Sequence, residues 1–109
     1  MNLITLHLEK AERNEELHRI LLTNEPDRFF DCKIVALFYA AVHYLKALSL
    51  KQHINIGETH YEIEGNCNPD RQIPIMPLDR EAWFHFSNLS RYSKESRYNV
   101  VVEQLKKDY

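Results

Sequence analysis

A tyrosine and a histidine interrupt an otherwise apolar stretch near the middle of the chain. The segment Phe29–Leu50 reads FFDCKIVALFYAAVHYLKALSL, and only His43 breaks the apolar and aromatic run from Ile34 to Leu45. Tyr39 and His43 are four residues apart, so a helix would place them one turn apart on one face. A buried polar group without a partner costs roughly 1–3 kcal/mol. His43 is therefore either hydrogen-bonded within a core or part of a site, where histidine can act as an acid or base near neutral pH.

The spacing of apolar residues predicts helices around this stretch. We expect the first helix over about 3–23, the apolar helix over about 27–52, a third from about Asp79 through Tyr92, and a short fourth over about 99–107. An apolar helix of this kind has to be surrounded by other helices. We predict that Ala11 allows a close approach of the first helix to its neighbour. The apolar face of this helix is predicted from four residues: Leu6, Leu17, Ile20 and Leu21.

The region between the second and third of these helices is predicted to be a long irregular loop. Residues 53–78 contain both glycines and three of the four prolines of the chain. Thr59 and Glu62 have the spacing of a capping box, which predicts one or two helical turns ending at Gly65. The sequence thus predicts one all-α domain over residues 1–109, a four- to five-helix up-and-down bundle with a long irregular loop between helices two and three.

Composition and charge indicate a soluble domain. The chain has 44% hydrophobic and 28% charged residues, and its formal net charge of −2 is not that of a protein that coats nucleic acid. The N-terminus lacks the pattern of a signal peptide, and the apolar run is shorter than the roughly 20 residues of a membrane span. We expect a cytoplasmic protein without membrane contact, whose two cysteines are reduced.

One set of residues has ligand types suited to zinc. His53, His60 and Cys67 recur every seven residues, and Asp70 follows them. The spacing matches no compact zinc motif, and glycines and prolines interrupt any common helical face. We predict no metal site and no cofactor.

A series of short motifs resembles the HEPN-like helical-bundle domains. The most specific of them is FYAAVHY, Phe38–Tyr44. The series runs in this order: Ala11 and Asn14, Pro26 and Asp27, Asp31, the LFYAAVHYLKAL segment, Thr59 and His60, and Ser96-Arg97-Tyr98. The resemblance implies a bundle that is commonly dimeric, in a superfamily associated with nucleotide binding, ribonuclease toxins and partners of minimal nucleotidyltransferases in prokaryotic defence.

The resemblance also highlights a candidate binding set: Asn14, Asp31, Tyr39, His43, His60 and Arg97. Tyr39, His43 and Lys46 share one stripe of the apolar helix, and the Arg97 guanidinium would anchor a phosphate or carboxylate. The alternative is a buried hydrogen-bond network that fixes the register of the helices, with Arg97 paired to Asp31.

The ribonuclease members of the superfamily carry an arginine, a polar residue and a histidine at short spacing. Two pairs fit that spacing, Arg13 with His18 and Arg80 with His85, and Arg80 and His85 are the candidate catalytic pair. Such a pair would act without a metal, with histidine transferring a proton and arginine stabilising charge on the phosphate.

Three functions follow as expectations. The first is a nucleotide- or RNA-phosphate-binding module, as part of a toxin–antitoxin or defence system, with a partner nucleotidyltransferase or antitoxin. The second is a metal-independent endoribonuclease acting at a dimer site, and the third is a non-catalytic, dimerising structural bundle. In each of them we expect a homodimer.

Overall fold

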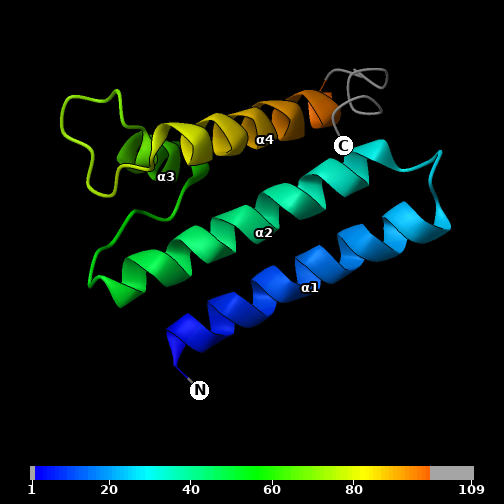
Figure 1. The fold of residues 1–109 in the computed structure, drawn as a ribbon, viewed down its shortest axis with the longest axis horizontal. Helices are drawn as coiled ribbons and strands as arrows, with labels where there is room; N and C mark the ends of the chain where they lie inside the picture. Colours follow the sequence, from blue (N-terminus) through cyan, green and yellow to red (C-terminus); the bar gives the residue numbers. More distant parts are fainter. Residues whose placement is uncertain (1, 99–109) are drawn as a thin grey trace.

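The chain is built from helices. The computed structural model describes residues 2–98, except for the side chains of residues 97 and 98. Within this part of the chain there are four helices and no strand: α1 (Leu3–Asn24), α2 (Phe30–Lys51), α3 (His60–Cys67) and α4 (Arg80–Tyr98) (Figure 1). The predicted all-α class is therefore confirmed, whereas the predicted last helix over 99–107 lies outside the described residues.

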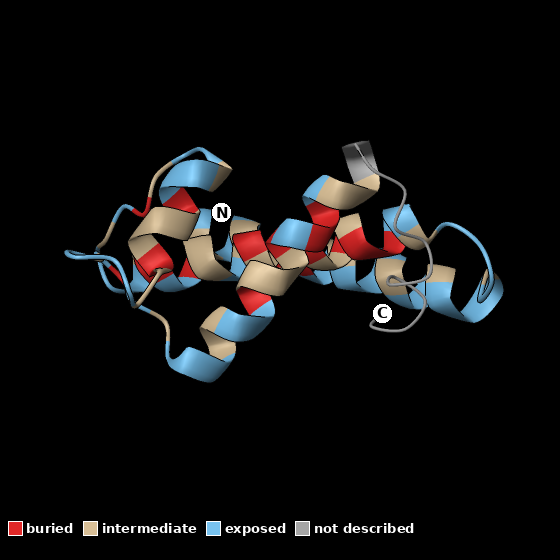
Figure 2. Ribbon diagram, turned by 90° about the horizontal axis from the view of Figure 1, so that it is seen from above, coloured by how far each residue is buried: buried red, intermediate tan, exposed pale blue. Residues whose placement is uncertain are grey.

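Helix α2 is the central element. It runs antiparallel to α1, packs against α1 on one side and against α4 on the other, and α3 lies beside the first turns of α4 (Figure 1). Buried positions are concentrated where the helices meet (Figure 2). Two neighbouring helices cover only part of the circumference of α2, and its residues Tyr44 and Leu48 remain 38% and 40% exposed. The expectation of a fully surrounded helix is corrected in this respect.

Local signals explain where the helices begin. The Asn2 side chain accepts a hydrogen bond from the backbone N–H of Thr5 at 2.8 Å and caps α1. Helix α2 begins at Phe30 and not near Asp27, because Phe29 has a left-handed backbone with φ of 57°. The buried Lys33 ammonium donates to the carbonyl oxygen of Glu25 at 2.5 Å, which ties the start of α2 to the end of α1.

The predicted loop between α2 and α4 is interrupted by a capped helix. Thr59 and Glu62 form the expected capping box at the start of α3. The helix does not stop at Gly65 but continues to Cys67. A Cβ at Gly65 would collide with the guanidinium of Arg71, so the glycine lets this side chain lie against the helix.

The main core lies between α2, α3, α4 and the segments before and after α3. Its buried residues are Phe38, Val42, Ile56, Ile63, Cys67, Met76 and Phe86. The backbone N–H of Met76 donates to the carbonyl of Asn66 at 2.9 Å, and that of Leu78 donates to Cys67 at 3.0 Å. The apolar segment 73–77 is thus attached to α3 through Met76, whereas Ile73 is 82% exposed.

The predicted apolar face of α1 is wrong in part. Ala11 is fully buried against α2, as expected, but Leu6, Leu17 and Ile20 are exposed. The reason is geometric, because α1 packs mainly against α2 and presents the side that carries Ala11 to it. These three side chains lie on the outer side of α1, where Lys10 and Arg13 separate Leu6 from Leu17 and Ile20.

Helix α2 also bears on the question of a membrane. Among the described residues, Phe30–Lys51 is the one helix long and apolar enough to cross a bilayer, with a mean hydropathy of 1.3. In the most apolar 18-residue stretch of α2, 44% is buried inside the protein. The core helix of a soluble protein meets the same criterion, so length and composition alone do not make α2 a membrane span.

Two phenylalanines on α4 test this packing. Phe86 is 4% exposed and Phe84 is 61% exposed. We predict that Phe86→Ala lowers the free energy of unfolding by about 3–5 kcal/mol, because it leaves a cavity in the core. Phe84→Ala is the matched control and should change it by less than about 0.5 kcal/mol. Urea denaturation followed by circular dichroism measures both, and equal losses would contradict the described packing of α4.

Candidate functional site

Two histidines meet between α1 and α2. The Nδ1 atoms of His7 and His43 are 3.0 Å apart, and the two rings are stacked with their centroids 5.2 Å apart. A hydrogen bond between two Nδ1 atoms needs one protonated and one unprotonated nitrogen, so the rings adopt different tautomers when both are neutral. His43 thus has a side-chain partner, and the partner comes from the opposite helix.

The surroundings of this pair are basic. Burial is the main cause that lowers the pKa of His7 below its ordinary value of 6.5, followed by the charges of Lys46 and Lys10, while Glu58 acts in the opposite direction. Burial likewise lowers the pKa of His43, and His7, Lys10 and Lys46 lower it further. Both rings therefore favour the neutral form, first because burial disfavours the charged ring and second because protonation would add charge to a basic cluster.

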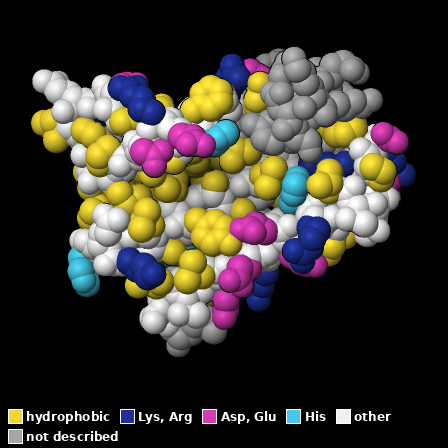
Figure 3. All heavy atoms as spheres, in the orientation of Figure 1, with side chains coloured by type: hydrophobic (Ala, Val, Ile, Leu, Met, Phe, Trp, Pro, Cys, Tyr) yellow, Lys and Arg dark blue, Asp and Glu magenta, His cyan; other side chains and the backbone are white. Residues whose placement is uncertain are grey.

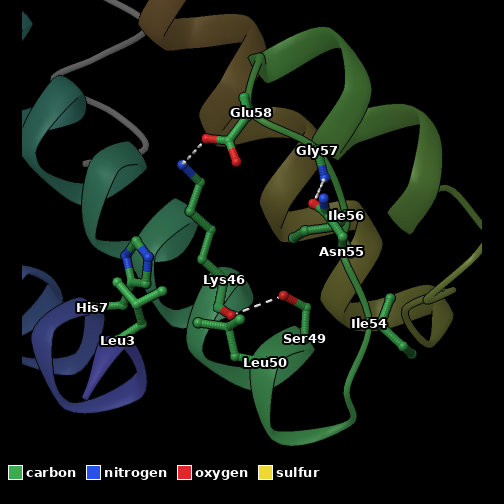
Figure 4. A pocket seen from close by; sticks show the side chains of 10 residues that line it. All are labelled: Leu3, His7, Lys46, Ser49, Leu50, Ile54, Asn55, Ile56, Gly57 and Glu58. Atoms are coloured by element: carbon green, nitrogen blue, oxygen red, sulfur yellow. Dashed lines mark hydrogen bonds and ion pairs between the residues drawn. The ribbon is translucent and has the colours of Figure 1, made fainter.

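A hollow of about 340 Å³ opens beside His7, on the side away from His43. His7 and Leu3 border it from α1, the chain segment 54–58 borders it on the other side, and Lys46 lies between them (Figure 4). The Lys46 ammonium points toward the Glu58 carboxylate at 4.0 Å, and the Glu58 side chain is 86% exposed. The hollow thus has a cationic group on its wall, paired only loosely with an acid.

An aromatic group continues the same side of α2. The rings of Tyr39 and His60 are 5.6 Å apart in an edge-to-face arrangement, and both residues are half-buried. The buried Phe38 ring supports them at 5.7 Å and 4.9 Å respectively. His60 reaches this position because the Thr59 cap starts α3 at that residue.

Of the predicted binding set, the structure brings Tyr39 and His60 into contact, and His43 is one turn along α2 from Tyr39. Tyr39, His43 and His60 lie along one side of α2, as described above. Asn14 lies on α1, and its side-chain amide donates to the backbone carbonyl of Lys10 at 2.9 Å. Asp31 is exposed in the first turn of α2.

Arg97 belongs to the last turn of α4, and its side chain is outside the description. Tyr92 of α4 packs against Ile34, near the start of α2. His43 lies more than two helical turns further along α2, roughly 13 Å from Ile34 by helix rise. The backbone of Arg97 is therefore at the other end of α2 from the hollow beside His7.

The two candidate catalytic residues lie apart from this side of α2. The Arg80 guanidinium contacts the Asp70 carboxylate at 2.5 Å, and both side chains are largely exposed. This contact raises the pKa of Arg80 and lowers that of Asp70. His85 is exposed, with its ring 5.6 Å from that of Phe84.

His7 is the site residue that the sequence reasoning missed. It shares the α2-facing side of α1 with Ala11 and Asn14, at a spacing of four and then three residues. That spacing was visible in the sequence and indicates a common helical face. The register between α1 and α2, which sets His7 against His43, was not visible.

The zinc-type residues do not form a cluster in the described part of the chain. No group of three or more histidine, cysteine, aspartate or glutamate side chains there could hold a metal ion. Cys67 is buried, and burial raises the pKa of its thiol to about 11. A thiol in this environment stays protonated at neutral pH.

Comparison of the chain with protein-family models, with curated proteins and with solved structures gave no match. The site therefore has to be interpreted from its own residues.

The histidine pair predicts a pH-dependent stability. Because both pKa values are lowered from 6.5, the folded protein binds fewer protons than the unfolded chain below that pH. Stability should be fully present above pH 6.5 and should fall as the pH decreases toward the lowered pKa values. Urea unfolding at about pH 7.5 and about pH 5.5 measures this loss.

Substitution of His43 separates the pair from other titrating groups. His43→Gln should reduce the loss between the two pH values, and His85→Gln, on the surface of α4, should leave it as in the wild type. Part of the loss should persist in His43→Gln, because burial also lowers the pKa of His18. Identical losses in the two variants would show that the pair does not determine the pH dependence.

Proposed function

We propose that this protein is a HEPN-like module that binds a phosphate-bearing ligand, a nucleotide or an RNA phosphate, beside the His7–His43 pair. The observation that carries the proposal is the stacked pair itself. The Nδ1 atoms of the two rings are 3.0 Å apart, and basic side chains surround them. The motif series from Ala11 to Tyr98 supports it independently.

The electrostatics of the pair favour an anion. Two lysines, Lys10 and Lys46, act on the two rings, and among the described residues Glu58 is the acid that opposes them at His7. An anion placed among these groups would offset the repulsion that a protonated ring meets from Lys10 and Lys46, and would favour protonation of the rings. Protonated histidine and lysine would then donate charge-assisted hydrogen bonds to phosphate oxygens.

Lys46 is well placed to contact such a ligand. Its side chain is 21% exposed and forms a wall of the hollow, so its position is restricted. Its present partner, Glu58, is at the 4.0 Å limit of an ion pair and mostly in solvent. Ion pairs of this kind contribute little, about 0–1 kcal/mol, so a phosphate could replace Glu58 at small cost.

The resemblance supplies the wider setting of this proposal. We expect a cytoplasmic homodimer that works in a toxin–antitoxin or defence system beside a partner nucleotidyltransferase or antitoxin. One structural feature is in keeping with such an assembly: the exposed apolar side chains of Leu17 and Ile20, one turn apart on α1. The face seen in Figure 3 likewise presents apolar side chains over a large area.

The alternative of a metal-independent endoribonuclease rests on Arg80 and His85. In the single chain an RNA phosphate would have to displace Asp70 from Arg80. Incubation of the protein with single-stranded RNA and a chelator tests this alternative. We expect intact RNA, and cleavage that is abolished by His85→Ala would favour the ribonuclease instead.

The third alternative, a dimerising structural bundle, would use the histidine pair only to hold α1 against α2. That alternative predicts a homodimer without affinity for nucleotides or RNA. It is therefore distinguished from the proposed function by binding and not by oligomeric state.

A lysine substitution tests the proposed site. Lys46→Ala should weaken binding of an oligoribonucleotide or of AMP by about 1.5–3 kcal/mol, the contribution of a hydrogen bond to a charged group. This corresponds to roughly a 10- to 150-fold higher Kd by isothermal titration calorimetry. Lys51→Ala, at the exposed end of the same helix, is the matched control and should bind as the wild type does.

Arg97→Ala, measured in the same series, determines whether Arg97 contributes a second phosphate contact, as the sequence predicts. If Lys46→Ala binds the oligoribonucleotide or AMP as tightly as the wild type does, the phosphate does not lie beside His7. Absence of any binding by the wild-type protein would favour the structural bundle.

A further inference from the structure

We infer that one open side of α2 is a docking surface for an amphipathic helix of a partner protein, which places apolar side chains against α2 and basic side chains along α1. Four residues of α2 define this open side: Leu37, Ala41, Tyr44 and Leu48. Tyr44 and Leu48 each lie two residues from Lys46, so they are on the opposite side of the helix from that lysine. The inference therefore does not depend on the proposed phosphate site.

In the described part of the chain, no helix covers the open side of α2. Helices α1 and α4 pack against α2 on either side (Figure 1), and α3 contacts the side that carries Tyr39 through the ring of His60. The spacing from Leu37 to Leu48 is four, three and four residues, which places these side chains on one face over roughly three turns. Tyr44 and Leu48 are 38% and 40% exposed. Because a helix as apolar as α2 is normally surrounded, the open side has the properties of a position for one more helix.

The shape of the open side also fits a helix. A hollow of about 400 Å³ lies there between α2 and α1. Its α2 wall is formed by Leu37, Ala40, Ala41 and Tyr44, and Glu15 and Arg19 lie on its α1 wall. The side chains of one helix pack into such grooves of another, and the two alanines leave room for a larger side chain of the partner.

The α1 wall of the hollow is acidic. A hydrogen bond to Glu15, burial, and the charges of Glu15 and Glu12 raise the pKa of Tyr44 to about 12, so both carboxylates act on the open side. The Arg19 guanidinium is paired with Glu16. Three carboxylates and one guanidinium leave an excess of two negative charges along this wall. Lysine or arginine side chains on a partner helix would complement this charge.

The same charge argues against a second copy of the chain as the occupant. A two-fold dimer through the open side would bring two identical surfaces together. Both surfaces carry the negative charge of Glu12 and Glu15, and like charges facing each other across an interface are unfavourable. A helix of a different protein with basic side chains avoids this repulsion, and the homodimer expected above would use another surface.

Two synthetic helical peptides test the inference. Both carry leucine at helical spacing on one side, and the other side carries lysine in the first peptide and glutamate in the second. The full-length protein should bind the lysine peptide at least about tenfold more tightly than the glutamate peptide, because only the lysine peptide complements the acidic wall. Fluorescence anisotropy of the labelled peptides measures both dissociation constants.

A leucine substitution locates the bound peptide. Leu48→Gln should weaken binding of the lysine peptide by about tenfold, the order of affinity that one buried leucine side chain contributes. Leu17→Gln is the matched control, because Leu17 is 46% exposed on the outer side of α1, and it should bind as the wild type does. Circular dichroism should show that both variants keep the wild-type helix content, since both leucines are exposed.

A charge reversal tests the acidic wall. Glu12→Lys should reduce the preference for the lysine peptide by about threefold or more, because it places a like charge beside the bound lysines. Glu9→Lys changes the net charge equally, but Glu9 lies two residues before Ala11 and therefore on the side of α1 that faces away from α2. Glu9→Lys should keep the wild-type preference. Equal effects of the two substitutions would show that net charge and not the open side selects the peptide.

The remaining outcomes would each overturn the inference. Equal affinities for the two peptides, no binding of either, or binding that Leu48→Gln leaves unchanged would show that the open side is not the docking surface for a basic helix. A wild-type dimer that Leu48→Gln dissociates in sedimentation would identify a second copy as the occupant. Binding of the lysine peptide by Leu105→Asp but not by the wild type would identify residues 99–109 of the chain itself as the occupant.

Discussion

Helix α2 has an apolar surface that extends round most of its circumference, and the arrangement of the chain follows from the need to cover it. Helix α1 covers one side through a close contact at Ala11, and α3 and α4 cover another through the core around Phe38 and Phe86. Apolar burial of this kind is the main stabilising contribution to a helical domain of this size. The remaining surface of α2 lies between these neighbours and carries the side chains available for binding.

The chemistry of the site depends on the same packing. His43 is on an apolar helix where an unpaired polar group would be costly, and the hydrogen bond to His7 satisfies it. This contact lies close to Lys10 and Lys46, so it concentrates basic groups at one position between the helices. A feature that stabilises the contact of α1 with α2 thus also creates a position where a phosphate would be stabilised.

Much of the fold could be predicted from local patterns in the sequence. The apolar periodicity indicated three long helices, and the Thr59–Glu62 spacing indicated the start of α3. The buried face of α1 was predicted only in part: Ala11 is buried as expected, but Leu6, Leu17 and Ile20, whose spacing also suits one helical face, are exposed. Local patterns do not reveal how many other helices pack against a given helix. Helix α1 packs mainly against α2, so only one of its faces is buried.

The candidate site was predicted in part for a related reason. Tyr39 and His43 share a helical face by their spacing alone, and the cap at Thr59 brought His60 to them. The partner of His43 depends on the register of two antiparallel helices, which is set by packing along their whole length. Arg97 is in the last turn of α4, and the path of that helix toward the start of α2 could not be deduced from sequence motifs.

The account depends most on the claim that an anion binds at the histidine pair, and NMR titration of the histidine rings tests it directly. The pKa values of His7 and His43 should both rise when pyrophosphate is added, because a bound anion favours the protonated rings. The resonances of His85, on the outer surface of α4, should not respond to pyrophosphate at constant pH. If the titration curves of His7 and His43 are the same with and without pyrophosphate, no anion binds there and the account is wrong.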